Sequence, residues 1–456
     1  MYSVVVIGGG PGGYAAAIRT AQLGGKVALV EAEQVGGVCV NSGCIPTKVW
    51  HNATTLLKAI KKANEFGIIV PSVDLDIKLI AERARRVSNY IRMGMEGLLK
   101  SKNVELIKGH AIVKNPQEVI VNGTALKTKS IILATGSELN TSLIKGLENS
   151  VWTTNHMINM TEVPSSVLIW GSEAIEVEMA CLLNALGSKV VLAFESRRIL
   201  PDEDSDISQR LSQALREQGV EILSRSILKS IELCRGGYRV ILSDPDEKII
   251  EVQKVLAASR SPRSSNMGLR QIGIEIDKKA GICINDKLET NIDGIYAVGD
   301  VTGGCMLSHV ATSMAVIAAE NAMGGSSKFL FHLIPRGIWA MPEIGAVGLS
   351  EEAAEKAGID FEVGHFPYAI NGLAMARGEM NGAVKIISNA QSGEIIGVHI
   401  IGSRATELIG ESVLAMQLKA TASDLSNSIR IHPTFSEAGI EAARDTNNWA
   451  LYLPKR

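Results

Sequence analysis

Residues 3–13 read SVVVIGGGPGG, and residues 26–31 read KVALVE. Both segments contain short apolar runs, which are typical of strands buried in a parallel sheet. Residues 12–23 between them are rich in small side chains, and we expect a helix there. A strand, a glycine-rich turn, a helix and a second strand in this order predict the βαβ opening of a doubly wound α/β fold.

The glycine-rich turn matches the pattern G-x-G-x-x-G through Gly8, Gly10 and Gly13. The first glycine allows a tight turn, the second lets the backbone approach a diphosphate, and the third lets the helix pack closely on the strand. The helix N-terminus favours the negative charge, and Glu31 at the end of the second strand can accept hydrogen bonds from ribose hydroxyls. The alternative is a glycine-rich turn that binds no ligand.

Residues 166–194 repeat this opening at a constant spacing, since Gly171 follows Gly8 by 163 positions and a Leu-Gly pair recurs at the same distance. The simplest explanation is a second βαβ nucleotide-binding domain that is inserted into the first. Residues 294–300 (GIYAVGD) then predict a strand that returns to the first domain.

From about residue 331 the pattern changes to antiparallel strands and helices, which predicts a separate domain. The strands expected there are 344–349, 383–388 and 394–401, and the helices are 351–357, 404–420 and 435–443. The predicted fold class is α/β, with two Rossmann-like nucleotide-binding domains, one inserted in the other, and a C-terminal α+β domain. We expect the domains to span 1–140, 141–262, 263–330 (a central segment that returns to the first domain) and 331–456.

Cys39 and Cys44 lie close together in GGVCVNSGCIPTK at residues 36–48. The sequence offers no Cys/His cluster that would complete a metal site with them, so the alternatives are two buried thiols or a redox pair. In an ideal α-helix their Cα atoms would be roughly 8.6 Å apart, whereas a disulfide needs about 4.4–6.8 Å. The pair can therefore form a bridge only across a distorted helix start, which Gly43 and Pro46 favour. A helix N-terminus also favours the thiolate, so we predict a dithiol/disulfide switch.

The composition argues against several classes of protein. A net charge of −2 and an aromatic content of 4% give no basis for binding nucleic acid or an anionic membrane. The longest apolar runs are far shorter than the roughly 18 residues that span a bilayer, and MYSVVV lacks the charged region of a signal peptide. Six cysteines in 456 residues are not a disulfide scaffold. We therefore expect a cytoplasmic protein with no nucleic-acid or membrane partner.

The segment GGVCVNSGCIPTK resembles the redox motif of the FAD-dependent pyridine nucleotide-disulfide oxidoreductases. Further motifs that are similar to the family's extend over the whole chain, including ATG at 134–136, GD at 299–300, MLSH at 306–309 and IHPTFSE at 431–437. The resemblance implies FAD in the first nucleotide-binding domain. The residues expected to bind it are Gly8, Gly10, Pro11, Gly13, Glu31, Ala32, Gly37, Val38, Lys48, His110, Ala111, Ala134, Thr135, Gly136, Gly299, Asp300, Met306, Leu307, Ser308 and His309.

The resemblance also implies roles for individual residues. Cys44 would lie against the flavin, and Cys39 would exchange with the substrate disulfide. Lys48 would sit beside the reactive flavin nitrogen and pair with Glu178, and Asp300 would hold the ribityl chain.

His432 and Glu437 resemble the catalytic dyad of the family. An imidazole can take a proton from a dithiol and return it, and a carboxylate behind it fixes the tautomer and stabilises the imidazolium. The alternative is structural, because Thr434-x-x-Glu437 is also a helix capping box. In the family the dyad comes from the partner subunit, which implies a homodimer with two shared active sites.

Residues 366–382 and 397–402 resemble the interface domain of the family members that oxidise dihydrolipoyl groups. This resemblance implies that the substrate is a lipoylated acyltransferase or carrier protein of a 2-oxoacid dehydrogenase-type complex, with NAD⁺ as the final acceptor. Two alternatives remain: a glutathione reductase-like enzyme that acts on another disulfide, and a flavoprotein whose nicotinamide site is degenerate and which uses a different acceptor.

The second glycine motif departs from the first. The spacing of 163 predicts glycines at 171, 173 and 176 and an acid at 194, but the chain has Glu173, Glu176 and Phe194, with Glu195 one place later. Carboxylates that face the turn would repel a diphosphate, whereas carboxylates that face solvent would spare the site. Nearby arginines leave NAD and NADP both open. The residues expected to bind the nicotinamide nucleotide are Gly171, Glu178, Glu195 and Arg260.

Overall fold

The computed structural model describes residues 1–140, 151–244 and 246–454. These residues form two compact units, the first made of residues 1–162 and 258–330 and the second of residues 163–257 and 331–456. The predicted boundary after residue 140 falls at the edge of a segment outside the described residues, and the four predicted domain boundaries stay a prediction. Within the described part of the chain, no helix is both long and apolar enough to cross a membrane.

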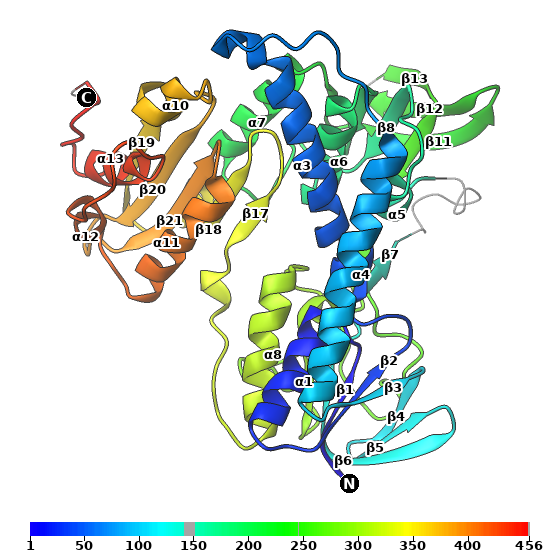
Figure 1. The fold of residues 1–456 in the computed structure, drawn as a ribbon. Coiled ribbons are helices and arrows are strands. Elements are labelled where there is room, and N and C mark those ends of the chain that lie inside the picture. Colours follow the sequence, from blue (N-terminus) through cyan, green and yellow to red (C-terminus); the bar gives the residue numbers. More distant parts are fainter. Residues whose placement is uncertain (141–150, 245, 455–456) are drawn as a thin grey trace. The chain divides into compact units, whose positions relative to one another are not determined.

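The first unit is built on strands β1 (Tyr2–Ile7), β2 (Val27–Glu31), β3 (Glu105–Lys108), β4 (Ala111–Asn115), β5 (Glu118–Val121), β6 (Thr124–Leu133), β7 (Ser137–Leu139), β15 (Arg260–Pro262) and β16 (Ile295–Ala297). Seven of them form one sheet (Figure 1). In its parallel part β1 lies between β2 and β6, and β3 and β16 extend it on the two sides. Strand β6 then continues into an antiparallel meander with β5 and β4.

The helices of this unit are α1 (Pro11–Gln22), α2 (Gly37–Asn41), α3 (Cys44–Lys61), α4 (Ile77–Ser101), α5 (Thr154–Ile158) and α8 (Ser308–Ala322), with 3-10 turns η1 (Ala63–Phe66) and η3 (Gly299–Thr302). Helix α1 packs against α8, and α3 packs against α4 (Figure 1). Pro11 opens α1, where a missing N–H costs nothing because the first turn has no acceptor for it. The helix predicted at residues 12–23 is present as α1.

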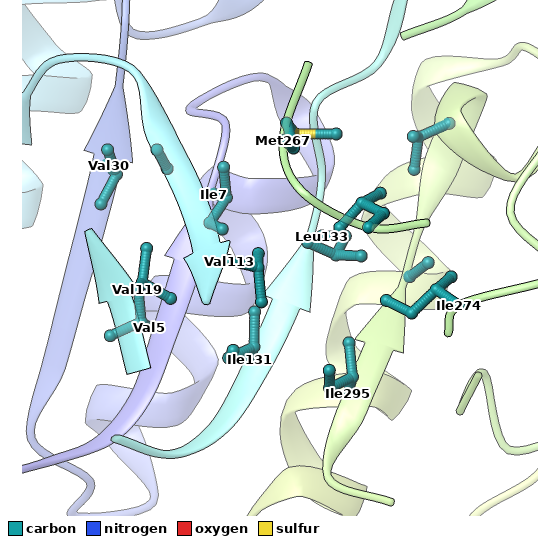
Figure 2. Close-up of a cluster of buried hydrophobic side chains, with 14 of the residues drawn as sticks. Val5, Ile7, Val30, Val113, Val119, Ile131, Leu133, Met267, Ile274 and Ile295 are labelled. Atoms are coloured by element: carbon teal, nitrogen blue, oxygen red, sulfur yellow. The ribbon is translucent and has the colours of Figure 1, made fainter. Parts of the chain in front are cut away.

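A continuous apolar cluster fills the space between the sheet and the meander of the first unit. Figure 2 shows Val5, Ile131 and Leu133 of the parallel strands together with Val113 and Val119 of β4 and β5. Each of these five side chains is buried. Burial of a side chain of this size contributes about 1.5–3 kcal/mol, so the cluster holds the ends of the parallel strands, and the loops that follow them, in fixed positions.

The second unit contains the inserted βαβ module. Its strands are β8 (Ser166–Trp170), β9 (Lys189–Ala193), β10 (Glu221–Leu223) and β14 (Lys254–Ala257) in one parallel sheet, and β11 (Ile227–Cys234), β12 (Gly237–Asp244) and β13 (Asp246–Val252) in an antiparallel sheet; its helices are α6 (Ala174–Ala185) and α7 (Ser205–Glu217). Val4 pairs with Val27 in the first unit and Val167 pairs with Val190 here. Both partners are shifted by 163 positions, so the predicted repeat holds even in strand register.

The C-terminal part of the second unit is a five-stranded antiparallel sheet with flanking helices. Its elements are η4 (Phe331–Leu333), β17 (Arg336–Ile338), β18 (Ile344–Gly348), α9 (Glu351–Lys356), β19 (Phe361–Pro367), η5 (Tyr368–Ile370), α10 (Gly372–Ala376), β20 (Ala383–Asn389), β21 (Ile395–Ile401), α11 (Ala405–Gln417), α12 (Ala422–Ser426) and α13 (Glu437–Asp445). Helix α11 packs on β18 and β21, and α13 packs on β19 and β20. The predicted fold class is confirmed.

Candidate active site

The turn between β1 and α1 forms a cradle that only glycine can line. Gly8 has φ +101°, and a Cβ atom at this position would lie 2.3 Å from the carbonyl oxygen of Ala134. A Cβ atom at Gly13 would lie 1.7 Å from the oxygen of Gly8. Both positions therefore exclude every other residue, which brings the start of α1 against the end of β6.

Gly10 has a different role, because its outer side is open. The nearest atom to a Cβ placed there is the Cα of Gly37, 3.9 Å away. The first turn of α1 reads PGGY and carries no charge, so the positive end of the helix dipole meets no side-chain anion of that turn. Glu31 accepts hydrogen bonds from the N–H groups of Gly9 (2.5 Å) and Glu33 (2.7 Å), which fixes its carboxylate beside the turn. This arrangement fits the diphosphate and ribose of FAD.

The other residues expected to bind FAD lie in the same unit, mostly in the segments that follow strands β2, β3, β6 and β16. Asp300 accepts a 2.6 Å hydrogen bond from Ser137 Oγ, which holds its carboxylate at the start of β7. Those that follow the strands are Ala32, Gly37, Val38, His110, Ala111, Thr135, Gly136, Gly299, Met306, Leu307 and His309. Lys48 and Ser308 lie near the cysteine pair, in α3 and at the first position of α8.

The cysteine pair lies on two helices rather than one. Cys39 is in the short helix α2, and Cys44 is the first residue of α3. Ser42 and Gly43 between them have non-helical backbone angles, with φ −147° and −131°. The helix distortion that the spacing demands is therefore a complete break between two helices. The two thiols lie close enough for each to shift the pKa of the other.

The surroundings favour a thiolate on Cys44 and a thiol on Cys39. The pKa of Cys44 is lowered to about 6, chiefly by the hydrogen bond with Cys39. Ser308 and Lys48 also lower this pKa, whereas desolvation by burial opposes the shift. The same hydrogen bond, together with burial, raises the pKa of Cys39. Cys44 Sγ lies 3.3 Å from Ser308 Oγ. Each of the two residues is the first of a helix, and a helix N-terminus favours a thiolate. No local sequence pattern indicates this contact with Ser308, because 264 positions separate the two residues.

Ser308→Ala is expected to reduce the thiolate fraction of Cys44 at pH 6. A hydrogen bond to a charged group is worth about 1.5–3 kcal/mol, so its loss lowers the ionisation constant of the thiol by about tenfold or more. The measurement is the pH dependence of thiolate absorbance in the reduced protein, with Thr312→Ala in the same helix as the control. An unchanged titration midpoint in Ser308→Ala would contradict the assigned contact.

His432 and Glu437 form the expected pair in the second unit. His432 Nδ1 lies 2.9 Å from Glu437 Oε1, and the His432 side chain is 78% exposed. The other carboxylate oxygen of Glu437 accepts a 2.7 Å hydrogen bond from the Thr434 N–H. One carboxylate oxygen thus contacts the imidazole and the other the backbone ahead of α13, which begins at Glu437 with Ser436 as its N-cap. The capping box predicted at Thr434 is not formed, and the catalytic role of the pair stays a prediction.

Glu178 and Lys48 lie in different units, and their pairing stays a prediction. Glu178 is in α6, where its Oε1 accepts a 3.0 Å hydrogen bond from the N–H of Trp339. This contact joins the inserted module to the segment that follows β17.

The second glycine turn is unlike the first. Glu176 is only 3% exposed, and a Cβ atom at Gly171 would lie 2.7 Å from its Cγ. For Glu176 the solvent-facing alternative is therefore wrong, because the side chain is folded beneath the turn. Glu173 is the N-cap residue of α6 and is exposed. The solvent-facing alternative therefore applies to Glu173 alone.

Among the remaining nicotinamide candidates and their neighbours, Arg260 and the nearby Arg198 already have protein partners. Glu195 is exposed just after β9. Arg198 is bound to Glu352 (3.1 Å) and to the carbonyl oxygens of Pro201 and Glu203. Arg260 belongs to the first unit, where it donates hydrogen bonds to the hydroxyl and carbonyl oxygens of Ser137. The second turn thus carries two glutamates at the positions where the first turn carries glycines.

Two family models match the chain. Residues 2–315 match the pyridine nucleotide-disulphide oxidoreductase model, and residues 334–443 match the dimerisation domain of the same family. The chain therefore belongs to the pyridine nucleotide-disulphide oxidoreductase family, whose members bind FAD and NAD(P). It is a flavin disulfide oxidoreductase of the lipoamide dehydrogenase kind.

Individual relatives are similar over nearly their whole length. The dihydrolipoyl dehydrogenase of Thermus scotoductus is 37% identical, covering 100% of this chain and 99% of that protein. The leghemoglobin reductase of Vigna unguiculata is 34% identical, covering 97% and 87%. The crystal structure of LpdA from Mycobacterium tuberculosis superimposes with a TM-score of 0.89 at 25% identity, covering 97% and 98%.

Proposed function

We propose that this protein oxidises dihydrolipoyl groups through a disulfide between Cys39 and Cys44, with FAD as the bound cofactor. The observation that carries the proposal is the break between α2 and α3, which brings Cys39 near Cys44 and leaves Cys44 Sγ 3.3 Å from Ser308 Oγ, where a thiolate is favoured. The similarity to dihydrolipoyl dehydrogenases over the whole chain supports the choice of substrate.

The chemistry begins on the disulfide of the oxidised protein. A thiolate of the dihydrolipoyl group attacks Cys39 Sγ, a substrate–Cys39 disulfide forms, and Cys44 leaves as a thiolate. Departure is fast because a thiol of low pKa is a good leaving group in disulfide exchange. The second thiolate of the substrate then attacks its own sulfur in the mixed disulfide, which closes the lipoyl ring and leaves Cys39 reduced.

FAD, when bound, supplies a two-electron acceptor that restores the disulfide. The residues that would hold its diphosphate and adenosine ribose are those of the β1–α1 cradle and Glu31, and Asp300 would hold the ribityl chain. Ser308 and Lys48 keep the Cys44 sulfur ionised.

His432 is the proposed base that takes protons from the substrate thiols, and Glu437 orients it. The imidazole is largely exposed on its own chain, as expected if it completes the cysteine site of a partner subunit. A homodimer agrees with the match of residues 334–443 to the dimerisation domain. The proposed substrate is the lipoyl group of an acyltransferase or carrier protein of a 2-oxoacid dehydrogenase-type complex.

Anaerobic stopped-flow mixing of the FAD-loaded protein tests this function. Dihydrolipoamide is expected to bleach the flavin absorbance rapidly, whereas reduced glutathione at the same thiol concentration is expected to leave it unchanged. Equal rates with glutathione, or no reduction by dihydrolipoamide, would refute the proposed substrate.

Glu437→Gln tests the positioning role of Glu437 separately from its role in the helix start. Glutamine keeps an acceptor for the Thr434 N–H but removes the charge that stabilises the imidazolium. Because a charge-assisted hydrogen bond is worth about 1.5–3 kcal/mol, we expect dihydrolipoamide reduction of the flavin to slow by about tenfold or more. The melting temperature should stay unchanged, and a fall in stability without a slower reduction would show a purely structural role.

A further inference from the structure

The two βαβ modules differ most where a diphosphate would bind. Helices α1 and α6 occupy equivalent positions, since both their first and last residues differ by 163. Gly10 is the N-cap of α1, and an uncharged turn follows it. Glu173 is the N-cap of α6, and Glu176 lies in its first turn. The repeat thus provides an internal control, because the same architecture has lost two glycines and gained two carboxylates in one copy.

The space beneath the second turn is filled. In the first module the position equivalent to Glu176 is Gly13, where not even a Cβ atom fits beneath Gly8. In the second module the Glu176 side chain lies against Gly171, with Cγ, Cδ and Oε1 at 2.7, 2.8 and 3.1 Å from a Cβ placed there. A buried carboxylate therefore replaces the close helix–strand packing that the third glycine normally provides.

The charge beside this turn is also unfavourable for an anion. Glu176 is at the third helical position of α6, where its carboxylate already interacts with the positive end of the helix dipole. The carboxylates of Asp202 and Glu203 lie close enough to Glu173 to interact with it electrostatically. Of these neighbours, Glu203 is neutralised by Arg336 through a two-bonded ion pair at 2.6 and 3.0 Å.

We propose that Glu176 and Glu173 close the second βαβ module to the diphosphate of NAD and NADP. The helix terminus that would hold the diphosphate holds the protein's own carboxylate instead. This inference rests on the proposed function, in which the dihydrolipoyl group reduces FAD through Cys39 and Cys44; neither NAD nor NADP then reoxidises that flavin. One pair of negative charges about 4 Å apart weakens binding by roughly fivefold in water and about a thousandfold at an effective dielectric constant of 20.

The test uses the FAD-loaded protein and a variant that restores the glycine motif. Glu173→Gly together with Glu176→Gly recreates G-x-G-x-x-G in the second module, while Glu173→Gln together with Glu176→Gln removes the charges and keeps the bulk. Each protein is mixed anaerobically with dihydrolipoamide, NADH or NADPH, and flavin absorbance is followed. NADH binding is measured independently by fluorescence titration.

Dihydrolipoamide should reduce the flavin in the wild type, and neither nucleotide should do so at about 1 mM, the upper end of usual KM values. The double glycine variant should bind NADH at least about 100-fold more tightly than the wild type, and the double glutamine variant should gain less. Saturable NADH or NADPH binding by the wild type would overturn the inference. No gain in the glycine variant would also overturn it, because the glutamates would then not be the cause.

The same experiment separates this inference from the proposed function. One outcome is that neither dihydrolipoamide nor either nucleotide reduces the flavin of the wild type, while the glycine variant gains NADH binding. The proposed function is then refuted, and the proposal that the second module excludes NAD and NADP is retained. The opposite outcome is that both dihydrolipoamide and NADH reduce the flavin of the wild type. The proposal that the second module excludes NAD is then refuted, and the proposed function is retained.

Discussion

Cys44→Ser is expected to reduce the oxidation of dihydrolipoamide to the uncatalysed background. A hydroxyl cannot form the disulfide that accepts electrons from the substrate, so the exchange that begins at Cys39 has no oxidised partner. In the wild type, a thiolate on Cys44 is favoured by the hydrogen bonds with Cys39 and Ser308 and by the charge of Lys48. The variant should therefore also lose the long-wavelength absorbance of the reduced FAD-loaded protein that arises from a thiolate against the flavin.

The measurement is steady-state turnover combined with the visible spectrum after reduction. Cys283→Ser is the matched control, because Cys283 is an exposed free cysteine of the same unit outside the proposed site, and it should keep both activity and spectrum. If the long-wavelength absorbance survived in Cys44→Ser, the roles of the two cysteines would be reversed. Retained turnover would exclude the pair from the reaction.

Lys385→Ala is expected to destabilise the second unit by about 3–5 kcal/mol, because it leaves the buried carboxylate of Asp204 without its cation. Lys385 is 2% exposed and forms ion pairs with Asp204 (2.7 Å) and Glu351. Although burial raises the pKa of Asp204, the hydrogen bond from Lys385 holds it below its ordinary value. The cluster joins the inserted module to the C-terminal domain within one compact unit.

Chemical denaturation followed by circular dichroism measures this loss as a lower midpoint for the second unit. Lys248→Ala removes a half-exposed ion pair with Glu221 in the same unit and should change the stability by at most about 1 kcal/mol.

The difference in the free energy of unfolding between Lys385→Ala and the wild type should become smaller in acid. Stability from a carboxyl group of lowered pKa is present above its unfolded pKa, near 3.9, and is lost as the pH falls through the folded value. If Lys385→Ala lost no more stability than Lys248→Ala, the proposed role of Lys385 in stabilising the second unit would be contradicted.

The fold was predictable where the sequence repeats a strong pattern. The spacing of 163 located the inserted module, and the register of β8 with β9 reproduces that of β1 with β2. The strand β19 was not predicted, because Gly364 interrupts its apolar alternation. Its place is set by tertiary packing: a Cβ atom at Gly364 would lie 2.0 Å from the carbonyl oxygen of Ala442 in α13.

The site was predictable where local motifs carry the chemistry. The cysteine spacing required a distorted helix, and the His432–Glu437 spacing allowed the observed hydrogen bond. The contact of Cys44 with Ser308 joins residues distant in sequence, so no local pattern predicts it. The orientation of Glu176 was equally hidden, because only the packing of α6 under Gly171 decides whether the side chain is buried.

Differential alkylation with mass spectrometry tests the central claim most directly. In the oxidised FAD-loaded protein, Cys39 and Cys44 should resist iodoacetamide and appear in a linked peptide. After one equivalent of dihydrolipoamide under anaerobic conditions, both should become alkylated, while the labelling of Cys181, Cys234, Cys283 and Cys305 should not change. Labelling of Cys39 and Cys44 that does not respond to dihydrolipoamide would contradict the account.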